Sequence, residues 1–307
     1  MREQWNQTGK ICRGIVPALV TPFDKAGEPN HKVLRQLIHH VVEGGVHGVF
    51  LVGTTGEFYA LSMEEKQGLF ETAVAEVNGA IPVYAGTGGT TTREAIRLTR
   101  LAKNVGVDAV SVLTPLFIRP SDQELFDHYA AIAASAEIPV LLYGNPGRTG
   151  ISLSSNVVSR LAQIDNIVGI KDSSGDLSQT MAYVQCTNSE FSVMAGRDTL
   201  IYATLCCGGA GAIAATANIV PSLVVRIYNA FMRGDHVGAQ QAQIQLAPLR
   251  MAFSLGTFPQ VMKEAVQVIG IDVGSARPPV GRLTRNERSE LEEAIRIALT
   301  DSTIQCA

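Results

Sequence analysis

Long apolar runs are missing from this chain, and so is any excess of positive charge. Its alanine- and glycine-rich segments never reach the roughly 20 apolar residues of a membrane-spanning helix. Residues 1–7 (MREQWNQ) contain no apolar stretch of the kind that a secretory signal peptide needs. The formal net charge is −3 and the positive residues are scattered, so no basic stripe indicates a nucleic-acid partner. We therefore expect a cytoplasmic protein that binds neither a membrane nor nucleic acid.

Cysteines and histidines are few and scattered, so they do not form the sequence clusters that indicate disulfides or metal sites. The five cysteines include the neighbours Cys206 and Cys207 but show no C-x-x-C spacing, which favours reduced thiols over disulfides or a zinc site. The six histidines fall mostly in predicted helices, whereas a metal-dependent aldolase needs histidine and carboxylate ligands at one site. The sequence therefore predicts no metal and no cofactor.

Short apolar runs alternate with amphipathic segments from residue 14 to about residue 230. The runs are rich in Val and Ile, as parallel strands buried on both faces should be, and cover 14–20, 48–53, 82–87, 108–114, 139–144, 167–172, 191–196 and 211–216. Helical patterns that begin at capping residues lie between them, and cover 30–44, 62–78, 91–105, 121–135, 154–163 and 176–187. Ser62 and Glu65 have the spacing of a capping box. These repeated strand–helix units predict a closed (β/α)8 barrel, or TIM barrel.

A doubly wound open sheet is the alternative fold, but the sequence lacks the dinucleotide fingerprint that often accompanies it. The glycine-rich stretch 86–90 (GTGGT) does not match G-x-G-x-x-G. From about residue 221 onward the pattern is helical only, interrupted at several glycines and prolines. We therefore expect a barrel over residues 1–230 and a C-terminal helical appendage, packed on the barrel, over residues 231–307.

Lysine is scarce, with seven in the chain, and Lys171 occupies an unusual position. It follows the apolar run 167–170 and precedes the polar loop 172–176. An amine among apolar residues loses hydration, which disfavours its charged form, and a neutral lysine can attack a carbonyl to form a Schiff base. A strand-end lysine can equally extend its amine into water, so Lys171 alone does not decide between these roles.

Other functional groups stand at the ends of the predicted strands. They are Thr54, Thr55 and Glu57 after the second strand, Tyr143 and Arg148 at the fifth, Gly196 at the seventh and Ile213 at the eighth. The carboxyl ends of barrel strands meet at one mouth, so we expect these residues to converge with Lys171, with Gly196 and Ile213 binding substrate and Glu57 making a structural contact. Taken singly, each is also explained by an ordinary turn, packing or surface role.

Three stretches of the chain resemble motifs of the dihydrodipicolinate synthase/N-acetylneuraminate lyase family. They are 53–57 (GTTGE), 143–150 (YGNPGRTG) and 169–172 (GIKD), in that order and each at a predicted strand end. The resemblance extends over nearly the whole chain, including 208–213 (GGAGAI). It implies a class I aldolase barrel that assembles as a homotetramer, a dimer of dimers.

The resemblance also implies roles for individual residues. Lys171 would form a Schiff base with the keto carbon of pyruvate or a related 2-oxo acid. Tyr143 would carry protons beside it, and Thr54 would relay protons to Tyr143. Thr54 and Thr55 would hold the pyruvate carboxylate. Arg148 would bind a carboxylate on the acceptor aldehyde, for which a planar bidentate donor is well suited.

One stretch departs from the family pattern. The synthases usually carry two tyrosines after the fourth strand, one of which reaches a neighbouring subunit's site, whereas 114–120 (TPLFIRP) has Phe117 there, without a hydroxyl. Phe117 argues against the lysine-pathway synthase, while Arg148 argues for a carboxylated acceptor. Our first expectation is therefore a Schiff-base lyase or aldolase that joins pyruvate to a small carboxylated aldehyde, or cleaves a compound into these two parts. A keto-deoxy sugar acid or a hydroxy-oxo acid is an example of such a substrate.

Other functions stay open at this point. The first is dihydrodipicolinate (4-hydroxy-tetrahydrodipicolinate) synthase itself, which condenses pyruvate with aspartate semialdehyde. A Schiff-base dehydratase or deaminase would use the same lysine chemistry. A non-catalytic sensor of a 2-oxo acid is a further alternative, which the set Lys171, Tyr143 and Thr54 opposes because a sensor needs no proton relay.

Overall fold

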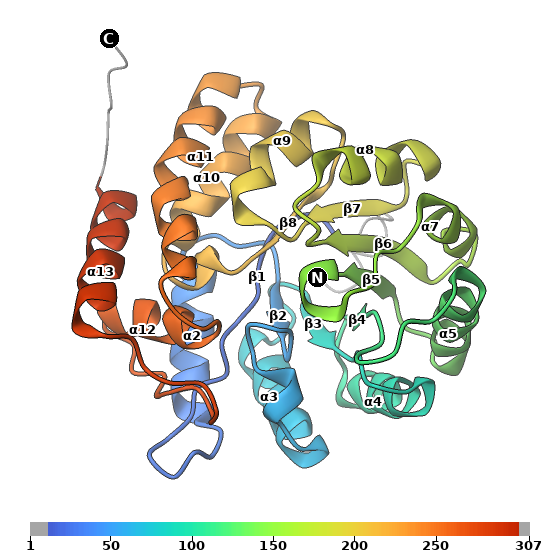
Figure 1. The fold of residues 1–307 in the computed structure, drawn as a ribbon, viewed down its shortest axis with the longest axis horizontal. Helices are drawn as coiled ribbons and strands as arrows, with labels where there is room; N and C mark the ends of the chain where they lie inside the picture. Colours follow the sequence, from blue (N-terminus) through green and yellow to red (C-terminus); the bar gives the residue numbers. More distant parts are fainter. Residues whose placement is uncertain (1–11, 301–307) are drawn as a thin grey trace.

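Eight parallel strands form a barrel surrounded by helices in the computed structural model, which describes residues 12–300 (Figure 1). The strands are β1 (Gly14–Pro17), β2 (Val49–Leu51), β3 (Val83–Gly86), β4 (Ala109–Leu113), β5 (Val140–Gly144), β6 (Ile167–Asp172), β7 (Ser192–Ala195) and β8 (Gly211–Ala214). From β2 to β8 each strand pairs with the next one along the chain, and β8 pairs with β1. The predicted (β/α)8 barrel is therefore confirmed.

The barrel closes where the chain after β1 changes its hydrogen-bonding partner from β8 to β2. Ala18 N, just beyond the end of β1, still donates to O of Ala214, the last residue of β8, at 3.0 Å, whereas the next residue, Leu19, donates to Phe50 O of β2, at 2.9 Å. Ala18 and Phe50 form a single parallel bridge. This change of partner ends β1 at Pro17, earlier than the predicted strand 14–20.

Helices follow the strands and cover the outside of the barrel (Figure 1). The main ones are α2 (His31–Glu43), α3 (Met63–Val77), α4 (Thr92–Val105), α5 (Asp122–Ser135), α7 (Ser155–Leu161), α8 (Leu177–Cys186), α9 (Ile201–Cys206) and α10 (Pro221–Met232). Local chemistry fixes several starts. The predicted capping box of α3 is present, because Ser62 accepts from Glu65 N while the Glu65 carboxylate accepts from Ser62 N.

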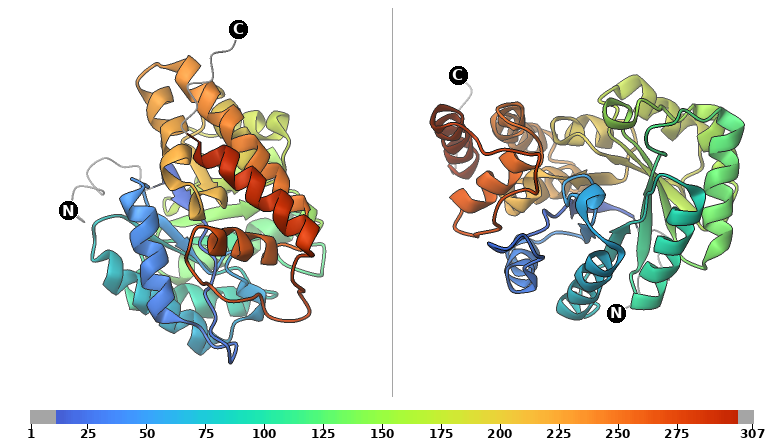
Figure 2. Two further views of the ribbon diagram at one scale, coloured as in Figure 1. Left: turned by 90° about the vertical axis from the view of Figure 1, so that its left-hand side faces the viewer. Right: turned by 60° about the horizontal axis from the view of Figure 1, so that its bottom comes forward.

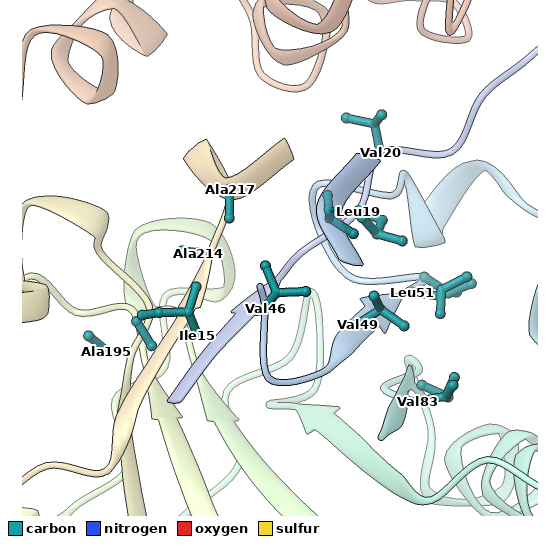
Figure 3. Close-up of a cluster of buried hydrophobic side chains, with 14 of the residues drawn as sticks. Ile15, Leu19, Val20, Val46, Val49, Leu51, Val83, Ala195, Ala214 and Ala217 are labelled. Atoms are coloured by element: carbon teal, nitrogen blue, oxygen red, sulfur yellow. The ribbon is translucent and has the colours of Figure 1, made fainter. Parts of the chain in front are cut away.

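Two apolar clusters form the core. The larger lies between strands and helices, and Figure 3 shows part of it, with Ile15, Val49 and Leu51 projecting from β1 and β2. The smaller fills the barrel interior and includes Phe50, Leu141 and Met194. A side chain that points inward at the upper end of a strand therefore stands on a packed floor, not over an open pore.

The C-terminal region packs against one side of the barrel (Figure 2). It consists of α11 (His236–Met251), the 3-10 turn η4 (Ala252–Ser254), α12 (Gln260–Val268) and α13 (Arg285–Leu299). Its helix α11 contacts both α10 and α13. The division at residue 230 stays a prediction; α10 runs across that position, from Pro221 to Met232.

No helix among residues 12–300 is both long and apolar enough to cross a membrane. Residues 1–7, on which the prediction of no signal peptide was based, lie outside the described part of the chain.

Candidate active site

A register shift between β5 and β6 aims Lys171 into the barrel. Val140 pairs with Ile167 but the next residue, Leu141, pairs with Gly169, so Val168 has no partner on β5. Ile167 and Ile170 both belong to the outer core although they are three positions apart along the strand. Alternation along a strand would place them on opposite faces. The extra residue changes the alternation, and Lys171 consequently faces inward beside Tyr143.

The Lys171 amine is buried above aromatic rings. The side chain is 4% exposed, and its Nζ lies 4.2 Å from the ring centroid of Tyr143 and 5.0 Å from that of Phe50. Phe50 belongs to the packed barrel interior, so the floor beneath the amine is apolar. Such surroundings keep water away from the nitrogen and leave it accessible only from the mouth of the barrel.

The Tyr143 hydroxyl is the centre of a short polar network. It lies 3.2 Å from Thr54 Oγ1 and accepts a hydrogen bond from Asn145 Nδ2 at 3.1 Å. Burial raises the pKa of Tyr143, but the positive charge of Lys171 and hydrogen bonds from Thr54, Asn145 and Ser173 outweigh it, so the pKa lies below its usual range. A phenol in this setting can exchange protons with the neighbouring amine more readily than an isolated tyrosine can.

The turn after β2 presents unused hydrogen-bond donors to the same space. Gly56 N donates to Gly53 O at 3.0 Å and closes the turn, and Thr21 Oγ1 holds it by donating to Gly56 O at 2.6 Å. Within residues 12–300, neither Thr54 N nor Thr55 N has a hydrogen-bond acceptor. Adjacent free N–H groups beside a hydroxyl form a suitable site for a small carboxylate.

One cavity of about 330 Å³ joins these groups. Every residue predicted for the site lines it, namely Thr54, Thr55, Tyr143, Arg148, Lys171, Gly196 and Ile213. Gly196 lies where a side chain would not fit, because a Cβ there would be 2.0 Å from Ser173 Oγ. The structure thus brings together residues from five of the strand ends, as the barrel topology requires.

Comparison with known proteins agrees with this arrangement. A family model described as the dihydrodipicolinate synthetase family matches residues 11–298. The chain belongs to this family. Membership confirms the resemblance seen in the sequence and the prediction of a class I, lysine Schiff-base enzyme.

Members with named activities are similar over almost their whole length. A 4-hydroxy-tetrahydrodipicolinate synthase from Methanopyrus kandleri is 38% identical over 290 residues, which cover 94% of this chain and 95% of the relative. The enzyme of that name from Bacillus subtilis is 38% identical over 282 residues, which cover 92% of this chain and 97% of the relative.

Solved structures of the family have the same fold. A dihydrodipicolinate synthase from Bacillus anthracis has a TM-score of 0.90 at 34% identity, covering 92% of this chain and 97% of that one. YagE, a prophage protein of E. coli that belongs to the family and was crystallised with pyruvate, has a TM-score of 0.90 at 31% identity. The match covers 93% of this chain and 98% of YagE.

The cavity of the present chain is also lined by residues that we did not predict from the sequence. They are Ala18, Asn145, Gly147, Ser173, Arg197, Asp198, Ala215, Arg250, Phe253 and Phe258. Asn145 and Ser173 lie in or beside the recognised motifs, and Arg197 follows Gly196 directly, so their positions carried a signal. Arg250 and Phe258 belong to the region predicted as an appendage, and no local pattern marks them as site residues.

Phe117 is not among the residues that line the cavity. Its side chain is 98% exposed, and its backbone is in the left-handed region at φ 74°. Among the described residues, the proton network around Tyr143 thus consists of Thr54, Asn145 and Ser173.

Glu57 has the structural role that we expected of it. Its carboxylate is fully buried and forms an ion pair with Lys263 of α12. Within residues 12–300, no group of three or more histidine, cysteine, aspartate or glutamate side chains could hold a metal ion.

Proposed function

We propose that this protein uses Lys171 to bind pyruvate as a Schiff base and adds the resulting enamine to a carboxylated aldehyde. The observation that carries the proposal is the arrangement of the buried Lys171 amine beside Tyr143, whose hydroxyl lies 3.2 Å from Thr54 Oγ1. The amine supplies a nucleophile, the phenol a proton carrier and the threonine turn a carboxylate site. The crystallised complex of YagE with pyruvate, at 31% identity, supports pyruvate as the first substrate.

The chemistry is balanced without an external oxidant or reductant. The Lys171 amine attacks the keto carbon of pyruvate, and the keto oxygen leaves as water to give the protonated imine. Transfer of a proton from the methyl carbon to Tyr143, the proposed proton carrier, gives the enamine, which forms a carbon–carbon bond to the aldehyde carbon. The aldehyde oxygen takes up a proton, for which Tyr143 is placed as donor. Water then hydrolyses the imine and frees Lys171, and every step is reversible.

The names of the relatives support aspartate semialdehyde as the acceptor. They support the 4-hydroxy-tetrahydrodipicolinate synthase reaction better than the sugar-acid lyase reaction that the sequence analysis placed first. Arg148, exposed at the mouth with its guanidinium 5.9 Å from the Phe258 ring centroid, is the group proposed to bind the acceptor carboxylate. Cleavage of a keto-deoxy sugar acid is the second candidate, favoured by Phe117, which has no hydroxyl where the synthases usually carry a tyrosine.

Trapping of the imine tests the proposal. The protein is incubated with pyruvate and borohydride, and its peptides are analysed by mass spectrometry. We expect a reduced pyruvyl adduct on Lys171, and none on that peptide in a Lys171→Arg variant. Folded protein that gains no adduct at saturating pyruvate would refute the proposed chemistry. Product formation with aspartate semialdehyde, compared with cleavage of sugar acids, then decides between the two candidate reactions.

A further inference from the structure

Three arginines from three different elements line the cavity. Arg148 lies on the short helix α6 (Pro146–Thr149), Arg197 follows β7, and Arg250 lies in the last turn of α11. The last two come from elements that are joined directly. Gln243 of α11 donates to Asp198 O at 2.9 Å and accepts from Tyr202 N at 3.0 Å.

None of these guanidinium groups is neutralised by a carboxylate in the described part of the chain. Within residues 12–300, Arg148, Arg197 and Arg250 form no ion pair with a carboxylate. Among the described residues that line the cavity, only Asp198 is acidic. Its Oδ2 is already occupied, because it accepts from both Thr216 N and Thr216 Oγ1 at 2.7 Å. The mouth of the cavity is therefore strongly positive.

The existing hydrogen bonds leave most of each guanidinium free. In its hydrogen bonds to described residues Arg197 uses only its Nε, which donates to Ser173 O at 3.3 Å. The guanidinium carbon of Arg250 lies 5.3 Å from the ring centroid of Phe253, which provides an apolar support beneath the charge. Both residues are partly buried, so an anion that reaches them meets donors already shielded in part from water.

A single acceptor carboxylate cannot satisfy this set. Under the proposed function the pyruvate carboxylate occupies the turn at Thr54 and Thr55, and the acceptor carboxylate pairs with Arg148. Arg197 and Arg250 then have no anionic partner. Aspartate semialdehyde, the acceptor that the relatives' names support, has one carboxylate and one ammonium group, so it would leave these two guanidiniums without an anion and place a cation near them. The two arginines therefore favour a more negatively charged acceptor for this chain than the one those names support.

We propose that Arg197 and Arg250 form a second anion subsite, and that the preferred acceptor carries a second negative charge, on a phosphate or a further carboxylate. The part of this inference that concerns the aldehyde rests on the proposed function, whereas the anion site itself does not depend on it. The volume of about 330 Å³ lies at the small end of ligand pockets, which fits pyruvate together with a short acceptor.

Binding of unreactive anions tests the subsite without requiring catalysis. Isothermal titration calorimetry of the full chain, with excess pyruvate present, compares glycerol 3-phosphate and malate with lactate, which has a single charge. We expect at least one of the two doubly charged compounds to bind about tenfold or more tightly than lactate, as one additional charge-assisted contact would give. The better of the two identifies phosphate or carboxylate as the group that the subsite prefers.

Variants assign the binding to the two arginines. Arg197→Met and Arg250→Met should each weaken binding of the preferred anion about tenfold or more. Arg233→Met is the matched control, because Arg233 is an exposed arginine at the end of α10 and is not part of the cavity. Binding that is unchanged in both cavity variants, or lactate that binds as tightly as the other two compounds, would overturn the proposal. Thermal unfolding of each variant verifies that it is folded.

Kinetics separate this inference from the proposed function. With pyruvate as donor, glyceraldehyde 3-phosphate is compared with glyceraldehyde and aspartate semialdehyde as acceptors. An adduct on Lys171 with no preference for a charged acceptor, and no anion binding at the arginines, would leave the Schiff-base function standing and refute the subsite. Anion binding that is lost in both cavity variants, in a protein that forms no adduct, would establish the subsite and refute the proposed reaction.

Discussion

Lys263 Nζ lies 2.7 Å from Glu57 Oε1, and both side chains are completely buried. The other Glu57 oxygen accepts from Arg277 N at 3.0 Å, and Lys263 also donates to Ser275 O at 3.1 Å. Glu57 ends the turn that presents Thr54 and Thr55, and its backbone is in the left-handed region at φ 56°. The C-terminal region is thereby tied to the turn proposed to bind pyruvate.

Loss of this ion pair should destabilise the fold. Burial lowers the pKa of Lys263 to about 8, while Glu57 raises it, so the amine is mostly protonated at neutral pH. Glu57→Gln leaves that charge buried without a partner, and we expect a loss of about 3 kcal/mol or more in the free energy of unfolding. Denaturant titration at pH 7 measures it. The double variant Glu57→Gln/Lys263→Met should recover part of the loss; a single variant as stable as the wild type would contradict the argument.

Removal of the Tyr143 hydroxyl should impair catalysis without preventing fold formation. The phenol is the proposed proton carrier, and such groups typically contribute a factor of about 100 to 10,000 to the rate. We expect Tyr143→Phe to lower kcat/KM by that factor. Tyr129→Phe is the control, because Tyr129 is also buried but donates to Val112 O outside the cavity, at 3.1 Å. Equal rates for the two variants would exclude the role assigned to Tyr143.

Acid should destabilise the protein through His128. The side chain is buried, its Nδ1 lies 2.9 Å from Thr92 Oγ1, and its Nε2 has no hydrogen-bond partner among residues 12–300. Burial lowers its pKa from 6.5 to about 4. The unfolded chain therefore binds more protons between pH 6.5 and pH 4, and stability falls as the pH is lowered through this window. Since one pKa unit corresponds to about 1.4 kcal/mol, the loss between pH 7 and pH 4.5 is on the order of 2 kcal/mol.

A variant isolates this contribution. His128→Asn keeps a polar group near Thr92 but cannot titrate. Chemical denaturation of both proteins at several pH values gives the difference, and we expect the wild type to lose more stability than His128→Asn on acidification. Parallel pH curves for the two proteins would show that His128 does not titrate as described.

Two glycines at the mouth should respond differently to alanine. A Cβ on Gly196 would lie 2.0 Å from Ser173 Oγ and 2.9 Å from Asp172 O, so the backbone must move. A Cβ on Gly144 would have no heavy atom within 4 Å. Because small displacements of positioning groups cost about 100-fold in rate, we expect kcat/KM to fall by at least tenfold in Gly196→Ala. Gly144→Ala should stay close to the wild type, and comparable losses in both would contradict this view of the site.

The elements of the fold could be predicted because local chemistry specifies them. Apolar runs rich in Val and Ile mark the strands, and capping residues such as Ser62 and Asn30 mark helix starts that the structure confirms. The order of the strand ends also placed Lys171, Tyr143 and Thr54 at one mouth. A parallel barrel allows this prediction, since all its strands end on the same side.

The sequence by itself determined the barrel, the boundaries of the six helices from residue 30 to residue 187 within a few residues, and the residue types available at the mouth. It did not determine which way Lys171 points, because an apolar strand buried on both faces has no polar alternation, and the register shift at Val168 depends on pairing with β5. Nor did it reveal Arg250 in the cavity or Lys263 beside Glu57. Those contacts join segments distant in the chain, and only tertiary packing brings them together, because no local propensity or spacing encodes which helix closes over which turn.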